Sequence, residues 1–355
     1  MTLKAALPFL LLLPSWAAAP PPRFAVEIPV LVLDHHGQPV LNLDRDQFRL
    51  RDDGLPQRIT TFDRAARPVS LAVVVDVTDR DAIAQVKRSA LLLTAMVMGA
   101  AGEASVYVSG PNPRQVLPFT HDQDKVASVL QHLQLSPTPP LDHGQVTEPA
   151  SQALLDLTHR PAADARAVLI IGKHAASRSP AATALFAGAL QQPIAIFRLA
   201  PQRPDGAAPY LNPDLPSRRG TGQGSQRVPQ LPVLAAGRGT SAQAPTDQAT
   251  VNLLPLPKTA LGLAAKVVAP HLRDYVYDSG GVTLQGGSDA DFDRKLSSIG
   301  ADLRSYYYLG YQPNDLATAG PRHRISVQVQ PLDGGPSYGQ LLFRRAYLVA
   351  PPPKP

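Results

Sequence analysis

The chain has 355 residues, which is enough for about two domains of ordinary size, and it contains no cysteine. The lack of cysteine excludes disulfides, thiolate metal sites, a cysteine nucleophile and a lipid anchor on cysteine. The formal charge of +6 is mild for this length and the basic residues are spread along the chain, so the composition favours a dispersed, solvated surface over a nucleic-acid interface.

Residues 1–19 have the order of a secretory signal peptide. Lys4 precedes an apolar stretch, Ala5–Leu13, and small residues follow. The stretch is too short to span a bilayer comfortably. Proline is a poor residue after a cleavage point, so we place cleavage near Ala17 and not before Pro20. No other segment of the sequence is apolar for long enough to form a membrane helix. We therefore expect an extracytoplasmic chain, periplasmic or secreted, with no integral membrane segment after cleavage. Retention of the signal as an anchor stays open.

Residues 23–66 have the pattern of β structure. FAVEIPVLVLD alternates and then runs apolar, DHHGQP supplies a turn, and FRLRDDGLPQRITTFD is typical of two short strands joined at Asp53-Gly54. His35 and His36 are adjacent on the turn, where side chains point apart, so they do not favour a shared metal ion.

Residues 68–303 alternate between strands and helices, as an α/β domain does. SLAVVVD, which ends at Asp76, is a continuous apolar run that suits a central strand of a parallel sheet, and helical spacing follows from Asp81 to Met98. Further strands are predicted in ASVYVSG, RQVLPFT, ARAVLIIG, PIAIFRL and GVTLQ, and further helices at 123–133, 148–158, 181–190, 259–278 and 288–303. Ser288 and Asp291 resemble a capping box for the last of these. The order predicts a doubly wound, mostly parallel sheet.

Two later segments depart from this alternation. Residues 200–257 are rich in Pro, Gly, Gln, Arg and Ser and keep no period, so they are predicted to form a flexible insertion within the α/β domain. Residues 304–350 return to β in RSYYYLGYQP, HRISVQVQP and QLLFRRAYLV. The strands at either end of the chain are too few for a sandwich by themselves, so we expect both ends to pack together as a smaller β-sandwich-like domain.

The stretch VVVDVTDRD, residues 73–81, places several oxygen donors at the end of a buried strand. Asp76 closes the first apolar strand of the α/β segment, and such sheets bind ligands at the carboxyl ends of their strands. Thr78, Asp79 and Asp81 follow at once. The cluster is typical either of a divalent-cation site or of a solvated loop, and these residues alone leave both interpretations open.

Motifs along most of the chain match one protein family. They are VLVLDHHGQPVLNLDRDQFRLRDDGLPQRITTFD near the start, SGGVTLQ and LSSIGADLRSYYYLGYQP after the insertion, and FRRAYLVAPP at the end. In these motifs the chain resembles the von Willebrand factor A-related exported proteins of acidobacteria. LRSYYYLGYQP is the most specific part. The resemblance implies a Rossmann-like A domain, flanked by β structure and used for binding rather than catalysis.

The resemblance also implies a metal-ion-dependent adhesion site built from three loops, of which this chain keeps a part. Asp76 and Thr78 match the first loop, but Arg80 stands where that loop has its second serine. Thr147 matches the threonine of the second loop. Mg²⁺ needs oxygen ligands near octahedral geometry, so each replacement weakens the site.

The third loop departs further from the family pattern. Gly172, Lys173 and His174 follow a buried strand where the family has Asp-Gly, so cationic groups replace a ligand. We predict a degenerate site without a resident cofactor and hypothesise that Lys173 or Arg80 pairs with Asp76. Weak Mg²⁺ binding stays open, either through the three matching residues or through a site rebuilt by neighbouring aspartates. The predicted binding loops comprise Asp76, Thr78, Asp79, Arg80, Asp81, Thr147, Lys173 and His174.

Patterns for catalysis are weak. The sequence has no Gly-x-Ser-x-Gly, His-Glu-x-x-His or Walker motif, and GTGQGS lies in the insertion without a preceding strand. The tyrosines of LRSYYYLGYQP could form an aromatic platform, although half of them should be core on an alternating strand. We predict a non-enzymatic protein that binds another protein or a cell-envelope component at the carboxyl edge of its sheet. A scaffold with an inert former metal site and a weakly Mg²⁺-dependent adhesion module are the alternatives, and a hydrolase has the least support.

Overall fold

The computed structural model describes residues 25–137, 147–172, 190–201, 276–313, 322–331 and 338–349. The predicted signal peptide, almost all of the predicted insertion and most of the helices predicted at 181–190 and 259–278 lie outside these ranges. Within them, no helix is both long and apolar enough to cross a membrane.

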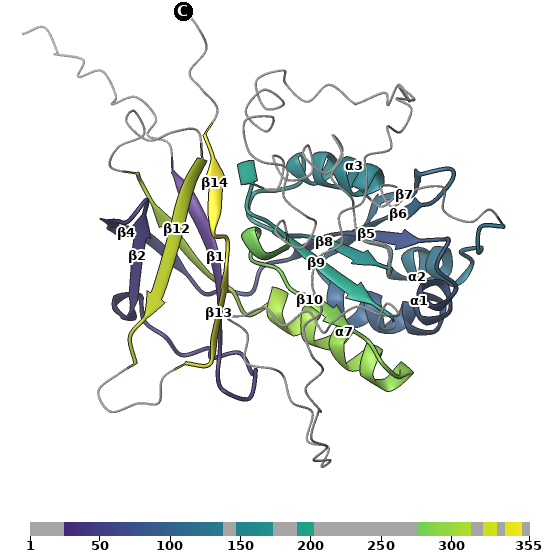
Figure 1. Cartoon of the computed structure of the whole chain (residues 1–355), viewed down its shortest axis with the longest axis horizontal. Coiled ribbons are helices and arrows are strands. Elements are labelled where there is room, and N and C mark those ends of the chain that lie inside the picture. Colours follow the sequence, from purple (N-terminus) through teal and green to yellow (C-terminus); the bar gives the residue numbers. More distant parts are fainter. Residues whose placement is uncertain are drawn as a thin grey trace, which may run out of the picture.

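A six-stranded sheet forms the centre of the larger domain (Figure 1). Its strands are β5 (Val69–Asp76), β6 (Glu103–Ser109), β7 (Arg114–Thr120), β8 (Ala165–Ile171), β9 (Ile194–Ala200) and β10 (Thr283–Gln285). The spatial order is β10-β9-β8-β5-β6-β7, and every neighbouring pair is parallel except β6 and β7. Every residue of β5 is buried, as its apolar run predicts. The doubly wound, mostly parallel sheet is therefore confirmed.

Helices cover both faces of this sheet. The helices are α1 (Arg80–Leu92), α2 (Gln123–Gln131), α3 (Thr147–Thr158) and α7 (Asp289–Leu303). Helices α1, α2 and α7 share one apolar core with Val73 and Val75, whereas α3 packs on the opposite face against Ala72 and Val74. The predicted helix 81–98 is α-helical only as far as Leu92. Its last part, Leu93–Met98, is a π-helical turn.

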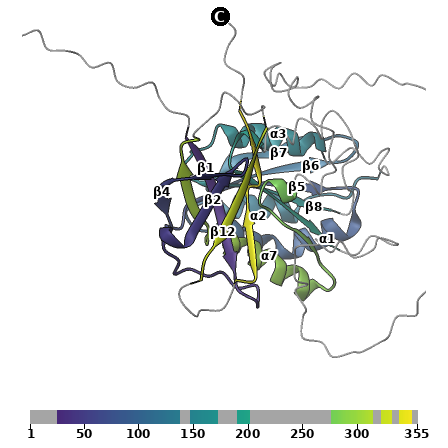
Figure 2. The ribbon, with the colours of Figure 1, turned by 60° about the vertical axis from the view of Figure 1, so that its left-hand side comes forward.

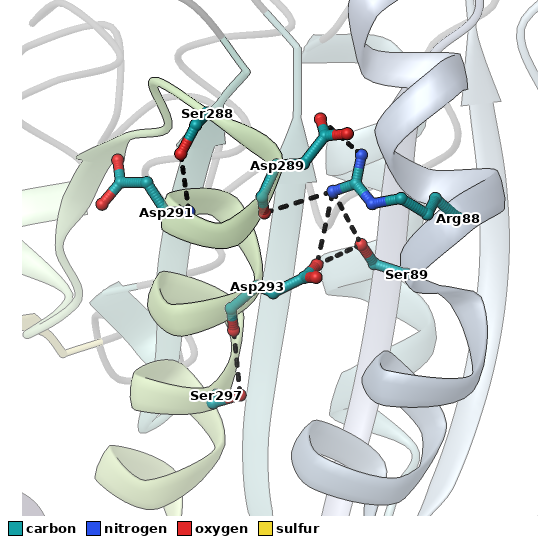
Figure 3. Close-up of polar contacts among 7 residues, drawn as sticks. All are labelled: Arg88, Ser89, Ser288, Asp289, Asp291, Asp293 and Ser297. Carbon is teal, nitrogen blue, oxygen red and sulfur yellow. Dashed lines mark hydrogen bonds and ion pairs between the residues drawn. The ribbon is translucent and has the colours of Figure 1, made fainter.

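Partly exposed polar contacts join α1 to α7 beside this core (Figure 3). The Arg88 guanidinium pairs with Asp289 at 2.5 Å and with Asp293 at 3.4 Å, and the Ser89 hydroxyl donates to Asp293. The predicted capping box of α7 is half formed. The Ser288 hydroxyl accepts from the Asp291 amide, but the Asp291 carboxylate accepts from the Gly287 amide and not from that of Ser288. These contacts fix α1, whose first turn carries part of the predicted site.

Strands from the two ends of the chain form a separate sandwich (Figures 1 and 2). One sheet has the order β13-β1-β11-β4 and the other β14-β12-β2-β3. The strands are β1 (Val26–Leu33), β2 (Phe48–Asp52), β3 (Leu55–Gln57), β4 (Ile59–Asp63), β11 (Tyr307–Tyr311), β12 (Arg322–Val329), β13 (Gln340–Phe343) and β14 (Ala346–Leu348), with a short 3₁₀ turn at Arg45–Gln47. Inward-facing residues of both sheets share one apolar core. The predicted β-sandwich-like domain is confirmed.

The last predicted strand, QLLFRRAYLV, is wrong as a single element. The chain bends at Arg344-Arg345, and its halves enter different sheets as β13 and β14. The buried Arg344 guanidinium donates to the carbonyls of Ala346 and Leu190. A buried guanidinium needs several acceptors, and the bend provides one of them.

The tyrosine-rich strand offers no exposed aromatic platform. All four tyrosines of LRSYYYLGYQP, the last three of which lie in β11, are buried, at 5% exposure or less: Tyr306, Tyr307, Tyr308 and Tyr311. Tyr307 and Tyr311 face the sandwich core, whereas Tyr306 and Tyr308 join the core of the α/β domain. The sheet that contains β11 is covered on both sides, so every residue of β11 is buried.

Candidate functional site

The predicted site lies where the winding of the large sheet reverses. β5 is the first strand of the sheet in sequence, and it lies between β6 and β8, so the connections leaving β5 and β8 diverge. Ligand sites of doubly wound sheets form at this switch point, beyond the carboxyl ends of the strands. Asp76 is the last residue of β5, and Gly172 directly follows β8. The sequence therefore places Asp76 at the position where this fold binds ligands.

The Asp76 carboxylate is bonded within its own loop. Its Oδ1 atom accepts from the Thr78 amide at 3.0 Å and from the Thr78 hydroxyl at 2.6 Å. The Asp76 carbonyl accepts from the Asp79 amide at 3.2 Å. Asp76 is 3% exposed, while Thr78 is half-buried. The carboxylate thus organises the turn, and a cation at Oδ1 would have to displace or share two donors.

Asp79 caps the first turn of α1. Its carboxylate accepts from the amides of Asp81 and Ala82 at 3.0 and 3.3 Å, as an N-cap residue does. Arg80 is exposed, and within the described residues no ion pair joins it to Asp76. Asp81 is half-exposed in the first turn. Of the two partners predicted for Asp76, Arg80 is therefore not paired with it in this structure.

Gly172 presses its backbone against Asp76. A Cβ atom added at Gly172 would lie 2.6 Å from the Cβ of Asp76, so a larger residue there would displace the carboxylate. The carbonyl of Gly172 accepts from the buried Arg198 guanidinium at 3.4 Å. Lys173 and His174 lie outside the described residues, as does the side chain of Thr147, although Thr147 begins α3. Of the predicted site, the structure thus brings together Asp76, Thr78 and Asp79.

A second polar cluster, absent from the sequence-based prediction, lies in the sandwich. Asp52, Asp53 and His323 place one ligand atom each within 4.8 Å of one another, so they could hold a metal ion. The sequence-based prediction missed this cluster because His323 lies far from the two aspartates in the sequence. One signal was available: the inward positions of β2 are Phe48, Leu50 and Asp52, so alternation already placed Asp52 toward a core.

A groove of about 540 Å³ is lined by residues in and around β2 and β3. Its lining includes four arginines, Arg45, Arg49, Arg51 and Arg58. Three of them are held locally. Arg45 pairs with the Asp46 carboxylate, Arg49 donates to the carbonyl of Asp46 and Arg51 donates to that of Gly54. The groove belongs to the sandwich and not to the edge that carries Asp76.

Comparison with known proteins gives similar structures but no family. No family model matches the chain, and no curated protein matches it. An aerotolerance-related membrane protein from Bacteroides fragilis is similar with a TM-score of 0.38 and 14% identity, covering 66% of this chain and 98% of that one.

Two other similar structures are a vWF domain and a protein with a MIDAS motif. The vWF domain of the pilus tip protein Mfa5 from Porphyromonas gingivalis has a TM-score of 0.25 and 15% identity, covering 31% of this chain and 39% of that one. Proximal thread matrix protein 1 from the mussel byssus, with a zinc-occupied MIDAS motif, has a TM-score of 0.36 and 12% identity, covering 68% of this chain and 48% of that one. These TM-scores and identities are too low to assign a function to this chain, and the fold class rests on the strand order.

Proposed function

We propose that this chain is an exported, non-enzymatic binding protein of the von Willebrand factor A type. Its partner is another protein or a cell-envelope component, held at the carboxyl edge of the six-stranded sheet. The observation that carries the proposal is the place of Asp76, which is buried at the switch point of the sheet with its loop ordered around it.

The proposed binding does not depend on a metal. Mg²⁺ requires near-octahedral oxygen ligands and gives up its waters reluctantly. Oδ1 of Asp76 already accepts two hydrogen bonds, one of them from the Thr78 hydroxyl that would have to turn its lone pairs to the ion. Hydrogen bonds and charge at the edge, including exposed Arg80, then supply the contacts to the partner.

Site-specific crosslinking tests the proposed face. A photo-crosslinking residue at Arg80 reports on the carboxyl edge, and one at Lys125 is the matched control. Both positions are exposed and lie in the first turn of a helix, but α2 follows the end of β7 that pairs with the start of β6, at the opposite edge of the sheet. We expect a defined product from position 80 in envelope extracts of the native host and none from position 125. Equal labelling at both positions would contradict the proposal.

The same experiment separates the two alternatives. Crosslinking at position 80 that persists in EDTA and in Asp76→Asn with added Mg²⁺ supports metal-independent binding. Loss of the product in EDTA and its recovery with Mg²⁺ would instead support a weakly Mg²⁺-dependent adhesion module. A scaffold with an inert edge predicts partners that survive substitution of the loop at 76–81 but are lost when surfaces of the sandwich are changed.

A further inference from the structure

Two polar side chains occupy core positions at one end of the sandwich. Along β2 the inward residues are Phe48, Leu50 and Asp52, and along β12 they are His323, Ile325 and Val327. Asp52 is 4% exposed and His323 is 2% exposed. Burying a carboxylate and an imidazole is costly unless they are paired, so their place in an otherwise apolar layer needs a partner that offsets it.

Hydrogen bonds hold one oxygen of Asp52 and leave the other unbonded. Its Oδ2 atom accepts from the Tyr311 hydroxyl at 2.8 Å and from the Tyr347 hydroxyl at 2.6 Å. Its Oδ1 atom has no hydrogen-bond partner and lies 3.6 Å from Nδ1 of His323. The two tyrosines therefore fix the carboxylate with a buried, unbonded oxygen directed at the histidine.

Asp53 completes the cluster from a constrained backbone. It has a φ of 47° and is the only non-glycine residue in the described ranges with a positive φ. Its amide donates to the Arg324 carbonyl and its Oδ1 atom accepts from the Arg324 amide, both at 2.8 Å. Oδ2 is left to face Nδ1 of His323 at 3.0 Å. The turn and β12 thus place this oxygen without help from the histidine.

The cluster carries more negative charge than its protein neighbours neutralise. Within the described residues, no lysine or arginine forms an ion pair with Asp52 or Asp53, and His323 is the one basic group beside them. Arg322, which flanks His323 on β12, pairs with Asp278 at 2.8 Å, and Arg324 is exposed. With a neutral imidazole, two carboxylates would share one pocket uncompensated, which a divalent cation would correct.

We propose that Asp52, Asp53 and His323 form a binding site for a divalent transition-metal ion, with Zn²⁺ the best match. Ligands bound at about 2.1 Å lie about 3.0 Å apart at a right angle and about 3.4 Å apart at the tetrahedral angle. The contact of Nδ1 with Asp53, at 3.0 Å, has this spacing, and the contact with Asp52, at 3.6 Å, is about 0.2 Å longer than the tetrahedral value. One imidazole nitrogen and two carboxylates suit zinc better than Mg²⁺, which prefers oxygen and keeps its waters.

The surroundings act as the outer shell of such a site. The His323 ring stacks on Tyr347 at 4.6 Å between centroids, which fixes the ring plane, and Tyr311 and Tyr347 orient Asp52. The Asp53 side chain is 35% exposed, so water or a donor from a partner can complete the coordination from that side. Nε2 of His323 has no hydrogen-bond partner, so the ring is held by stacking and by Nδ1.

Zinc binding by the full-length, tag-free chain tests this proposal. After chelator treatment, equilibrium dialysis against Zn²⁺ with metal analysis should give about one tightly held ion per chain. Asp53→Asn is the sharpest variant, because asparagine tolerates a positive φ and its carbonyl can still accept from the Arg324 amide. It should weaken binding by about tenfold or more. His323→Gln should do the same.

Control variants make each outcome decisive. Asp46→Asn changes an exposed aspartate near β2 and should leave zinc binding unchanged. Binding that survives Asp53→Asn, or no bound zinc at micromolar free ion, would overturn the proposal and leave the Asp53–His323 contact as a purely structural one. Zinc lost in Asp76→Asn but kept in Asp53→Asn would place the metal at the sheet edge, which would overturn this proposal and the metal independence proposed above. Circular dichroism of each variant confirms that it is folded.

Discussion

Asp76 and Asp52 each end a strand with a buried carboxylate, at 3% and 4% exposure. The two carboxylates differ in how far along the sequence their hydrogen-bond donors lie. Asp76 accepts from Thr78, two residues further on. Asp52 accepts from Tyr311 and Tyr347, which lie 259 and 295 residues away. The first is a local turn at a ligand edge, and the second is a junction of three strands drawn from both ends of the chain.

This difference predicts different consequences when the carboxylate is removed. The donors to Asp76 lie on a half-buried loop, where water can replace the lost acceptor. The donors to Asp52 are tyrosine hydroxyls on side chains that are 0% and 1% exposed, so no water replaces it. An unsatisfied buried donor costs more than the hydrogen bond itself contributes. The sandwich junction should therefore be structural as well as polar.

Removing each carboxylate gives the largest expected effect. We expect Asp52→Ala to lower the free energy of unfolding by about 3 to 5 kcal/mol, and Asp76→Ala by about 1 to 2 kcal/mol. Urea unfolding followed by circular dichroism measures both. Asp46→Ala, at an exposed position, is the control and should change little. Equal losses for the two buried sites would show that rehydration does not distinguish them.

Alkaline pH should affect the sandwich junction next most strongly. Burial raises the pKa of Tyr311, as do neighbouring Tyr347 and Asp52, and burial with the bond to Asp52 raises the pKa of Tyr347. Unfolded tyrosines ionise near pH 10, whereas these keep their protons in the fold, so the native state binds more protons above that pH and stability falls as pH rises.

The tyrosine contribution is measurable as a slope. Ionisation of these two tyrosines in the unfolded state should lower the free energy of unfolding by about 2 kcal/mol between pH 10 and 11. The double variant Tyr311→Phe with Tyr347→Phe should be less stable at pH 8 but lose less over this interval. Tyr338→Phe, at a half-buried position, serves as the control. An unchanged slope in the double variant would mean that other groups govern alkaline unfolding.

The sequence predicted what is local or periodic. The apolar run ending at Asp76 predicted a central strand, and the helix predicted at 288–303 agrees with α7. The cluster of Asp52 and His323 could not be found this way, because it depends on the pairing of β2 with β12. The bend at Arg344 depends on where a buried guanidinium finds carbonyl acceptors. At the candidate site, Asp76 and Thr78 were predicted, but their bond to each other was not.

Removing the N-terminal cap of α1 should have a smaller effect on the free energy of unfolding. Asp79 accepts from two amides of the first turn, so Asp79→Ala should cost about 1 to 2 kcal/mol, whereas Asp79→Asn keeps an acceptor and should cost only a few tenths. Thermal unfolding of the three proteins measures this. If alanine and asparagine cost the same, the charge of Asp79 and not its capping bonds would be what stabilises the turn.

The Thr78 hydroxyl gives the smallest expected effect and the most direct test of the local turn. Thr78→Val keeps the side-chain shape and the amide bond to Asp76 but removes the hydroxyl donor, so it should cost about 1 kcal/mol. Thr78→Ser keeps the donor and should cost less. In an Asp76→Ala background the hydroxyl has lost this acceptor, so Thr78→Val should then cost close to nothing. If the valine costs the same in both backgrounds, the hydroxyl does not act through Asp76, and the loop at the sheet edge is held by its backbone alone.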